Sequence, residues 1–375
     1  MTRGLSWRNF DFLLLGAIVL ASAFGTVMIR SAVAGNEVLQ PLILRQVYFA
    51  LLGVTLIFLV ASVDYRYWLS LYIPIYIVII GFLLTLTGFG QTAFGAQRWF
   101  QVGVLFLQPT EFAKIIAIII LARYFEAVQY QPRDLKWVIG AALWASGIIL
   151  LILLQPNLSN VMVLSVILAV MLFVNGIELR WILIAGTAGA VLLIMVIALS
   201  VLGVRIPGLQ EYQQQRIVNF VVPDPNDTYG NRYNVQQALI AVGAGGFLGE
   251  GYNQGTQTQL RFLKVRHTDF IFAASSEEFG TVGGGLIILV IAFIVWRCIR
   301  AAQKARDMAG SMIAIGMATL IFFQGFVNIG MNLNLLPVSG LPLPFISYGG
   351  SGLTALMLGI GLVESVVMRQ KELDF

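Results

Sequence analysis

The chain is poor in several residue types that water-soluble enzymes use freely. It has one cysteine, Cys298, so neither an intrachain disulfide nor a multi-cysteine metal site can form. It has one histidine, His267, which excludes a histidine-rich metal site. Only 11% of its residues are charged, whereas soluble domains carry about 25%. The scarcity of charge excludes a water-soluble globule.

Apolar residues are abundant where charged residues are scarce. They make up 58% of the 375 residues, and the mean hydropathy is +0.86. Long apolar runs alternate with short polar loops, and each run is about long enough to cross a bilayer as a helix. We therefore predict an all-α polytopic membrane protein that forms one domain over residues 1–375. The ten predicted spans are 10–29, 44–62, 69–88, 110–126, 136–154, 158–175, 180–203, 269–296, 310–333 and 351–368.

The basic residues indicate how these spans are oriented. With a cytoplasmic N-terminus, thirteen basic residues fall on inside segments: Arg3, Arg8, Arg66, Arg123, Arg133, Lys136, Arg180, Arg297, Arg300, Lys304, Arg306, Arg369 and Lys371. The short outside loops then hold only Arg30, Arg45 and Arg98. This positive-inside bias predicts that both termini are cytoplasmic. The net charge of +5 is thereby explained by topology, and no nucleic-acid partner is expected.

One predicted outside loop, residues 204–268 between spans seven and eight, is much longer than the others. Loops of this length are usually functional or disordered, and its apolar, aromatic and glycine content argues against disorder. Its middle, residues 235–248, is apolar and is followed by several glycines. We expect a short helix at the membrane interface and then close-packed turns.

Ionisable residues at or inside predicted spans are the first candidates for function, because they are costly in hydrocarbon. Asp269 stands at the outer end of the eighth span, where it could carry chemistry or serve as a helix N-cap. Glu277 and Glu278 lie about two turns further along, and helical spacing would put Glu277 on the face of Asp269. These two glutamates either form a buried network between helices or have a functional role.

Two further groups of charged residues belong to the first half of the chain. Glu111 and Lys114 are three residues apart on the fourth span and can pair on one helix face. Arg98 lies in the preceding loop, where it could hold phosphate or act as an interfacial anchor beside Trp99. If the outer ends of the spans gather these cations around Asp269, the site suits an anionic, lipid-linked substrate.

Several motifs resemble the SEDS family (shape, elongation, division and sporulation). The most specific are His267 to Ala273, followed by Glu277 to Gly280, and the long run from Leu336 to Ser351. Shorter matches, in the family's order, are Gly95 to Trp99, Gln108 to Lys114, Gln155-Pro156, Gln215 to Ile217 and Gly255 to Leu260. The Leu336 run and the Gly255 run are most similar to the family's elongation branch.

This resemblance implies a ten-helix peptidoglycan glycosyltransferase in the bacterial cytoplasmic membrane. Such an enzyme polymerises lipid II into glycan strands at the outer membrane face during cell elongation. Its implied partner is a class B penicillin-binding protein, a transpeptidase that cross-links the strands. The implied substrates are lipid II and the glycan linked to undecaprenyl pyrophosphate.

The resemblance also assigns roles to individual residues. Asp269 matches the family's essential aspartate, and Glu111 with Lys114 matches its buried ion pair. Arg98, Lys114, Arg216 and Gln237 are the expected substrate-binding residues. Asp269 is either the general base or a ligand for a divalent cation, Mg²⁺ or Mn²⁺; no organic cofactor is expected. The family's usual Gln-Pro-Asp is here Gln155-Pro156-Asn157, which puts an acid or metal role there in doubt.

Two other classes of function remain open at this stage. Intramembrane charges within a hydrophobic bundle are also compatible with a lipid II flippase, a transporter. A scaffold that only anchors a wall-synthesis complex through its apolar helix faces would need no chemistry at Asp269.

Overall fold

The computed structural model describes residues 7–89, 91–93, 96–102, 105–204, 206, 211–222 and 231–370. Most of these residues are helical, as predicted, and one small sheet interrupts the pattern. The elements are η1 (Trp7–Asn9), α1 (Phe12–Ala32), α2 (Pro41–Ser62), α3 (Tyr65–Ser70), α4 (Tyr72–Phe89), β1 (Gln91–Ala93), β2 (Ala96–Val102), β3 (Leu105–Leu107), α5 (Pro109–Ala127), α6 (Leu135–Leu154), α7 (Leu158–Val174), α8 (Leu179–Val201), α9 (Glu211–Val221), α10 (Asn231–Ala244), α11 (Thr256–Gln259), α12 (Ile271–Lys304), α13 (Met308–Asn332) and α14 (Gly350–Met368).

Each of the ten predicted spans coincides with a helix. Seven of the helices in the described ranges are long and apolar enough to cross a membrane: α1, α2, α6, α8, α12, α13 and α14. The apolar parts of α4 and α7 are shorter, and α5 carries four charged residues. The chain is therefore a multi-pass helical membrane protein.

Local sequence explains where many of these helices begin. The side chains of Asp11, Asp134 and Asp307 each accept a hydrogen bond from a backbone N–H in the first turn of α1, α6 and α13. Pro41 and Pro109 occupy the first position of α2 and α5, where the missing N–H costs nothing.

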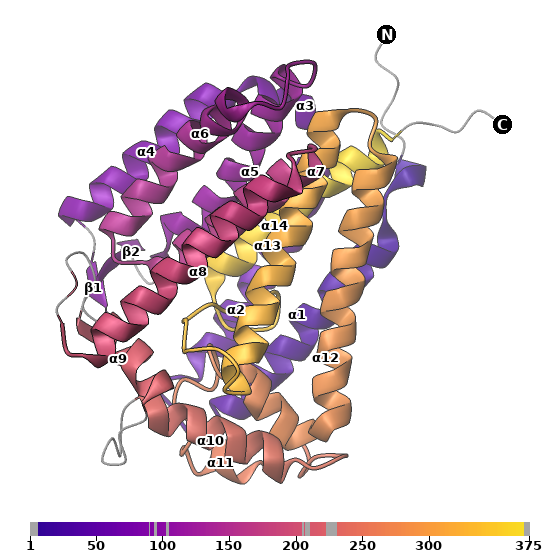
Figure 1. The fold of residues 1–375 in the computed structure, drawn as a ribbon. Coiled ribbons are helices and arrows are strands. Elements are labelled where there is room, and N and C mark those ends of the chain that lie inside the picture. Colours follow the sequence, from indigo (N-terminus) through magenta and orange to yellow (C-terminus); the bar gives the residue numbers. More distant parts are fainter. Residues whose placement is uncertain are drawn as a thin grey trace.

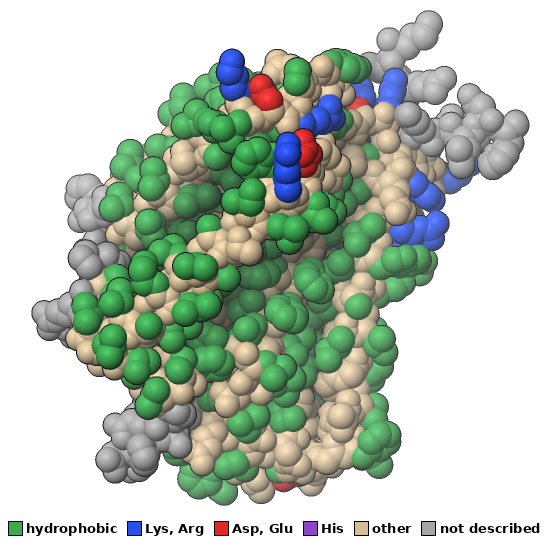
Figure 2. All heavy atoms as spheres, in the orientation of Figure 1, with side chains coloured by type: hydrophobic (Ala, Val, Ile, Leu, Met, Phe, Trp, Pro, Cys, Tyr) green, Lys and Arg blue, Asp and Glu red, His purple; other side chains and the backbone are tan. Residues whose placement is uncertain are grey.

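The bundle has a centre and a periphery. Helices α13 and α14 are mostly buried, and they pack against α12, α5, α7 and α2. By contrast, Ser200 is the sole buried residue of α8, which lies along the outside of the bundle (Figure 1). The visible side of the molecule is largely hydrophobic, and basic side chains gather at its upper end (Figure 2).

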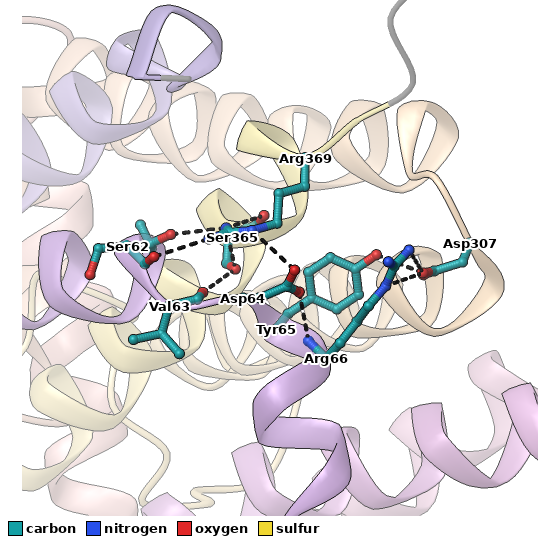
Figure 3. Close-up of polar contacts among 9 residues, drawn as sticks. Ser62, Val63, Asp64, Tyr65, Arg66, Asp307, Ser365 and Arg369 are labelled. Carbon is teal, nitrogen blue, oxygen red and sulfur yellow. Dashed lines mark hydrogen bonds and ion pairs between the residues drawn. The ribbon is translucent and has the colours of Figure 1, made fainter. Parts of the chain in front are cut away.

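Hydrogen bonds tie the helix corners together at this basic end (Figure 3). Asp307 accepts from the Tyr65 hydroxyl at 2.7 Å and pairs with the Arg66 guanidinium at 2.7 Å. Arg369 donates to the carbonyl oxygen of Ser62 at 3.0 Å, and the Ser365 hydroxyl donates to Val63. The corners after α2 and α12 are thus fixed to each other and to the end of α14.

At the opposite end lie α9, α10 and α11, all from the predicted long loop 204–268 (Figure 1). Helix α10 confirms the short helix expected around residues 235–248. The loop before α5 differs from expectation, because β1, β2 and β3 form a three-stranded antiparallel sheet there. These strands were not predicted from the sequence.

The predicted eighth span is not one continuous helix. Gly280 breaks α12 with φ 65° and ψ −164°, a conformation essentially restricted to glycine. Residues 246–251 fill the break: the N–H groups of Glu250 and Gly251 donate to the carbonyls of Glu277 and Glu278, at 2.9 and 3.0 Å. The N–H of Thr281 donates in return to Gly246 at 2.9 Å. The break therefore anchors the long loop to α12.

We predict that Gly280→Ala destabilises the protein strongly. An added Cβ would lie 2.4 Å from the carbonyl oxygen of Phe247, in addition to the unfavourable φ. The expected cost is at least about 3 kcal/mol, measured as a lower midpoint of thermal unfolding in detergent. Gly285→Ala is the matched control, because a Cβ there has no neighbour within 4 Å. Equal midpoints for the two variants would contradict the assigned role of the break.

Candidate functional site

Asp269 lies in the turn that leads into α12, not on the helix itself. The N–H groups of Thr268 and Phe270 both donate to the carbonyl of Val265, and Phe270 is the N-cap of α12. The N-cap alternative for Asp269 is therefore wrong. The expectation that Asp269 and Glu277 share a helix face is wrong as well, because the helix starts only at Ile271.

Two asparagines on α13 hold the backbone of Asp269. Asn328 and Asn332 each donate a side-chain N–H to its carbonyl oxygen, at 3.1 and 3.0 Å, and both are fully buried. Asn332 also accepts the N–H of Ala273 at 3.1 Å through its amide oxygen. Asn328 and Asn332 are four residues apart, so they lie on one face of α13. Sequence reasoning missed this pair, although polar residues at helical spacing in an apolar span were a usable signal.

The segment between α13 and α14 supports the same turn from another side. The Ser347 hydroxyl donates to the carbonyl of Thr268 at 2.7 Å, and the N–H of Tyr348 donates to His267 at 2.9 Å. A Cβ at Gly340 would lie 3.8 Å from the Asp269 carboxylate, so that carboxylate lies beside this segment. Much of the long family-like run from Leu336 to Ser351 thus serves to position Asp269.

The surroundings of Asp269 change its acidity. Burial raises its pKa to about 6, and the charge of nearby Arg216 acts in the opposite direction. Burial also lowers the pKa of His267 to about 4, with Arg266 adding to the shift, so this histidine is neutral at physiological pH. A carboxyl group with a pKa about 6 can take up and release a proton near neutral pH.

A cleft lies at the end of the bundle that carries α9 and α10, and Asp269 is not among the residues that line it. Its lining combines polar and apolar side chains: Arg216, Asn219, Phe220, Val235, Gln236, Leu239, Asn334, Leu336, Pro337 and Val338. Arg216 donates to the carbonyl of Val338 at 3.3 Å and is the lining residue that acts electrostatically on Asp269. Such a cleft suits a ligand with both an anionic and an apolar part.

The other predicted substrate-binding residues are placed differently. Gln237 is half-buried on α10, next to Gln236 of the cleft lining. The backbone of Arg98 belongs to β2, but its side chain lies outside the described residues. Lys114 is 1% exposed and is held by other protein groups.

Lys114 forms a buried ion pair with Glu111 on α5. Its Nζ lies 2.8 Å from both carboxylate oxygens of Glu111 and 3.2 Å from the side-chain oxygen of Asn160 on α7. Asn160 donates in turn to the Thr110 hydroxyl at 3.5 Å. These contacts join α5 to α7 inside the bundle. A substrate-binding role for Lys114 stays a prediction.

Glu277 and Glu278 pin the long loop to α12. Glu277 accepts the backbone N–H groups of Gln257 and Thr258, at 2.6 and 3.0 Å, and the Thr258 hydroxyl at 2.6 Å. Glu278 accepts the hydroxyl of Ser31 on α1. These bonds favour the buried-network interpretation of the two glutamates.

Comparison with known proteins shows extensive similarity. A family model described as "Cell cycle protein", which groups FtsW, RodA and SpoVE, matches residues 7–372. The chain is 33% identical to peptidoglycan glycosyltransferase MrdB of Escherichia coli K12 over 357 residues, 95% of this chain and 93% of that protein. It is 35% identical to stage V sporulation protein E of Bacillus subtilis over 329 residues, 86% of each chain.

Solved structures share the fold over almost the whole chain. Rod shape determining protein RodA of Thermus thermophilus superposes with a TM-score of 0.71 at 27% identity, over 98% of this chain and 99% of that one. A chain of a peptidoglycan synthase complex that coordinates polymerization and crosslinking gives a TM-score of 0.80 at 29% identity, over 98% and 100%.

We predict that the Glu111–Lys114 pair behaves as a coupled unit in stability measurements. Glu111→Gln or Lys114→Met alone leaves one buried charge without its partner, which costs about 3–5 kcal/mol. The double variant leaves no such charge and should recover most of that loss. Thermal unfolding of the three variants in detergent measures the coupling. Additive losses in the double variant would show that the two side chains do not stabilise each other.

Proposed function

Since the chain belongs to the cell cycle protein family of FtsW, RodA and SpoVE, we propose that it polymerises lipid II into glycan strands at the outer face of the cytoplasmic membrane. It is a peptidoglycan glycosyltransferase. The observation that carries the proposal is the position of Asp269, whose backbone carbonyl is held by Asn328 and Asn332 and whose carboxylate is electrostatically coupled to Arg216 of the cleft lining.

The proposed reaction joins two sugars by substitution at one carbon. The 4-hydroxyl oxygen of one lipid II sugar attacks the anomeric carbon of the growing chain, and the bond from that carbon to undecaprenyl pyrophosphate breaks. The carboxylate of Asp269 takes the hydroxyl proton as general base. Inversion at one centre needs one base and a cation near the leaving group, so a second catalytic carboxylate is not required.

Arg216 is the described cation best placed to stabilise the departing pyrophosphate. It lines the cleft, whereas Lys114 is enclosed by Glu111 and Asn160. A guanidinium binds phosphate oxygens in a bidentate manner, and such stabilisation acts where charge develops during the reaction. Gln237 and Arg98 remain proposed substrate contacts.

A divalent cation, Mg²⁺ or Mn²⁺, would be held at this site by Asp269 together with the substrate. Within the described ranges no group of three His, Cys, Asp or Glu side chains could hold a metal. Asp269 would supply a protein ligand, and substrate phosphates and water would supply others, as Mg²⁺ sites often do. Bound there, the ion would offset the pyrophosphate charge.

The proposed function also includes a membrane topology, a partner and a cellular role. We place ten spans in the membrane with both termini in the cytoplasm, which puts α9, α10 and the cleft outside. The similar chain in the peptidoglycan synthase complex supports a class B penicillin-binding protein as partner. The similarity to MrdB and to the rod shape determining protein RodA supports a role in cell elongation.

We predict that Asp269→Asn abolishes polymerisation without unfolding the protein. Loss of a general base costs at least about 100-fold in rate. The assay follows conversion of labelled lipid II to long glycan by the purified protein, with and without its partner and a chelator. Glu178→Gln, an exposed glutamate on the entry to α8, is the control. Full activity of Asp269→Asn, or lipid II translocation in liposomes without polymer, would overturn the proposal in favour of a scaffold or a flippase.

We predict that polymerisation falls as the pH drops through about 6, because the base must be ionised to accept a proton and burial raises the pKa of Asp269 to about 6. Arg216 lowers that pKa, so Arg216→Gln should move the acid limb of kcat/KM to higher pH. When each profile of kcat/KM against pH is normalised to its maximum, this shift can be separated from a loss of rate. Arg180→Gln, an exposed cation on α8, should leave the limb in place. An unmoved limb in Arg216→Gln would contradict the electrostatic coupling between Arg216 and Asp269.

A further inference from the structure

A second cleft lies at the end of the bundle opposite the proposed active site. It is enclosed by the start of α1, the last turns of α12 and the end of α14, and its lining is Asn9, Phe10, Asp11, Phe12, Leu13, Arg297, Arg300, Ala301, Lys304, Val367 and Gln370. The proposed polymerisation reaction uses none of these residues. In the proposed topology this cleft faces the cytoplasmic side of the membrane.

The cleft carries a surplus of positive charge. Arg297, Arg300 and Lys304 follow one another at spacings of three and four residues, so they share one face of α12. Asp11 is the acidic residue of the lining, and it forms an ion pair with Arg297 at 2.5 Å. One cation is thus neutralised, and Arg300 and Lys304 form no ion pair within the described part of the chain.

The floor of the cleft is rigid. Asp11 is buried; its carboxylate caps α1 by accepting the N–H of Leu14 at 3.0 Å, and its own N–H donates to Glu364 of α14 at 3.0 Å. The ion pair to Arg297 ties α12 to the same point. Arg300 and Lys304 therefore lie next to a point where side-chain contacts already join α1, α12 and α14.

The side chains at the rim of the cleft are of the kinds found where a membrane meets water. Phe12 and Leu13 are 62% and 63% exposed at the start of an apolar helix, where they can contact acyl chains. Trp296, half-exposed, lies under the guanidinium groups of Arg297 and Arg300, at 5.6 and 5.1 Å from its ring centre. Tryptophan is enriched at membrane interfaces, and the amides of Asn9 and Gln370 can donate to phosphate or hydroxyl oxygens.

We propose that this cleft binds the phosphodiester headgroup of an anionic glycerophospholipid. Arg300 and Lys304 contact the phosphate, the amide side chains contact the glycerol, and the acyl chains run along Phe12 and Leu13. Basic pockets between helices on the cytoplasmic side are suited to such headgroups, which are abundant in anionic leaflets. The bound lipid would join α1, α12 and α14 at the end of the bundle away from the polymerisation cleft.

The test compares binding of phosphatidylglycerol and phosphatidylcholine to the detergent-purified chain. Native mass spectrometry counts bound lipids, and the thermal unfolding midpoint is followed as each lipid is titrated. Wild type should bind one phosphatidylglycerol preferentially and melt at a higher temperature with it. In Arg300→Gln/Lys304→Gln the apparent affinity should fall at least about tenfold.

Matched controls separate the cleft from general surface charge. Lys136→Gln/Arg180→Gln removes two exposed cations at the same end of the molecule but outside the cleft, and it should bind lipid as wild type does. Both double variants should melt like wild type without added lipid, because the substituted side chains are exposed. Equal loss of binding in the two double variants, or equal binding of phosphatidylcholine, would overturn the proposal. Saturation by glycerol 1-phosphate alone would overturn the lipid assignment in favour of a soluble phosphate.

Discussion

The carbonyl oxygen of Asp269 accepts hydrogen bonds from two buried asparagines, and the arrangement of the proposed active site depends on this contact. A backbone carbonyl in an apolar bundle must find a donor inside the protein. Asn328 and Asn332 provide these donors, and Asn332 at the same time accepts the N–H of Ala273 in the first turn of α12. Satisfying the backbone therefore also fixes the position of Asp269, the proposed catalytic residue, relative to α12 and α13.

The same constraint explains why the long loop 204–268 folds against the bundle. At Gly280 the break in α12 exposes backbone groups, and residues 246–251 supply the missing partners. Glu277 then binds the backbone N–H groups at the start of α11, and Glu278 accepts from Ser31 of α1. The break in α12 thus holds the helices of the long loop beside the cleft. It requires glycine at position 280.

Hydropathy predicted the helices well, because a buried or lipid-facing helix needs apolar side chains along its whole length. All ten predicted intervals contain a helix, with ends shifted by at most three residues except that α12 continues to Lys304, eight residues beyond the predicted end. The break at Gly280 was not predictable, since its cause is a loop some thirty residues earlier in the chain. Asp269 was wrongly placed on a helix face with Glu277 for a different reason, because α12 begins only at Ile271. The Glu111–Lys114 contact was accessible from spacing alone, whereas the Asn160 contact was not.

Asp269 and Arg216 belong to different parts of the fold, and each position suits its part in the proposed reaction. Asp269 lies in a turn bonded to α13 and to the segment before α14, both in the centre of the bundle. Arg216 belongs to α9, which packs on α8 and α10 at the periphery, and its bond to Val338 is 3.3 Å long. A general base must stay fixed relative to the attacking hydroxyl. Arg216 lines the cleft, where its guanidinium can meet the negative charge that develops on a departing pyrophosphate.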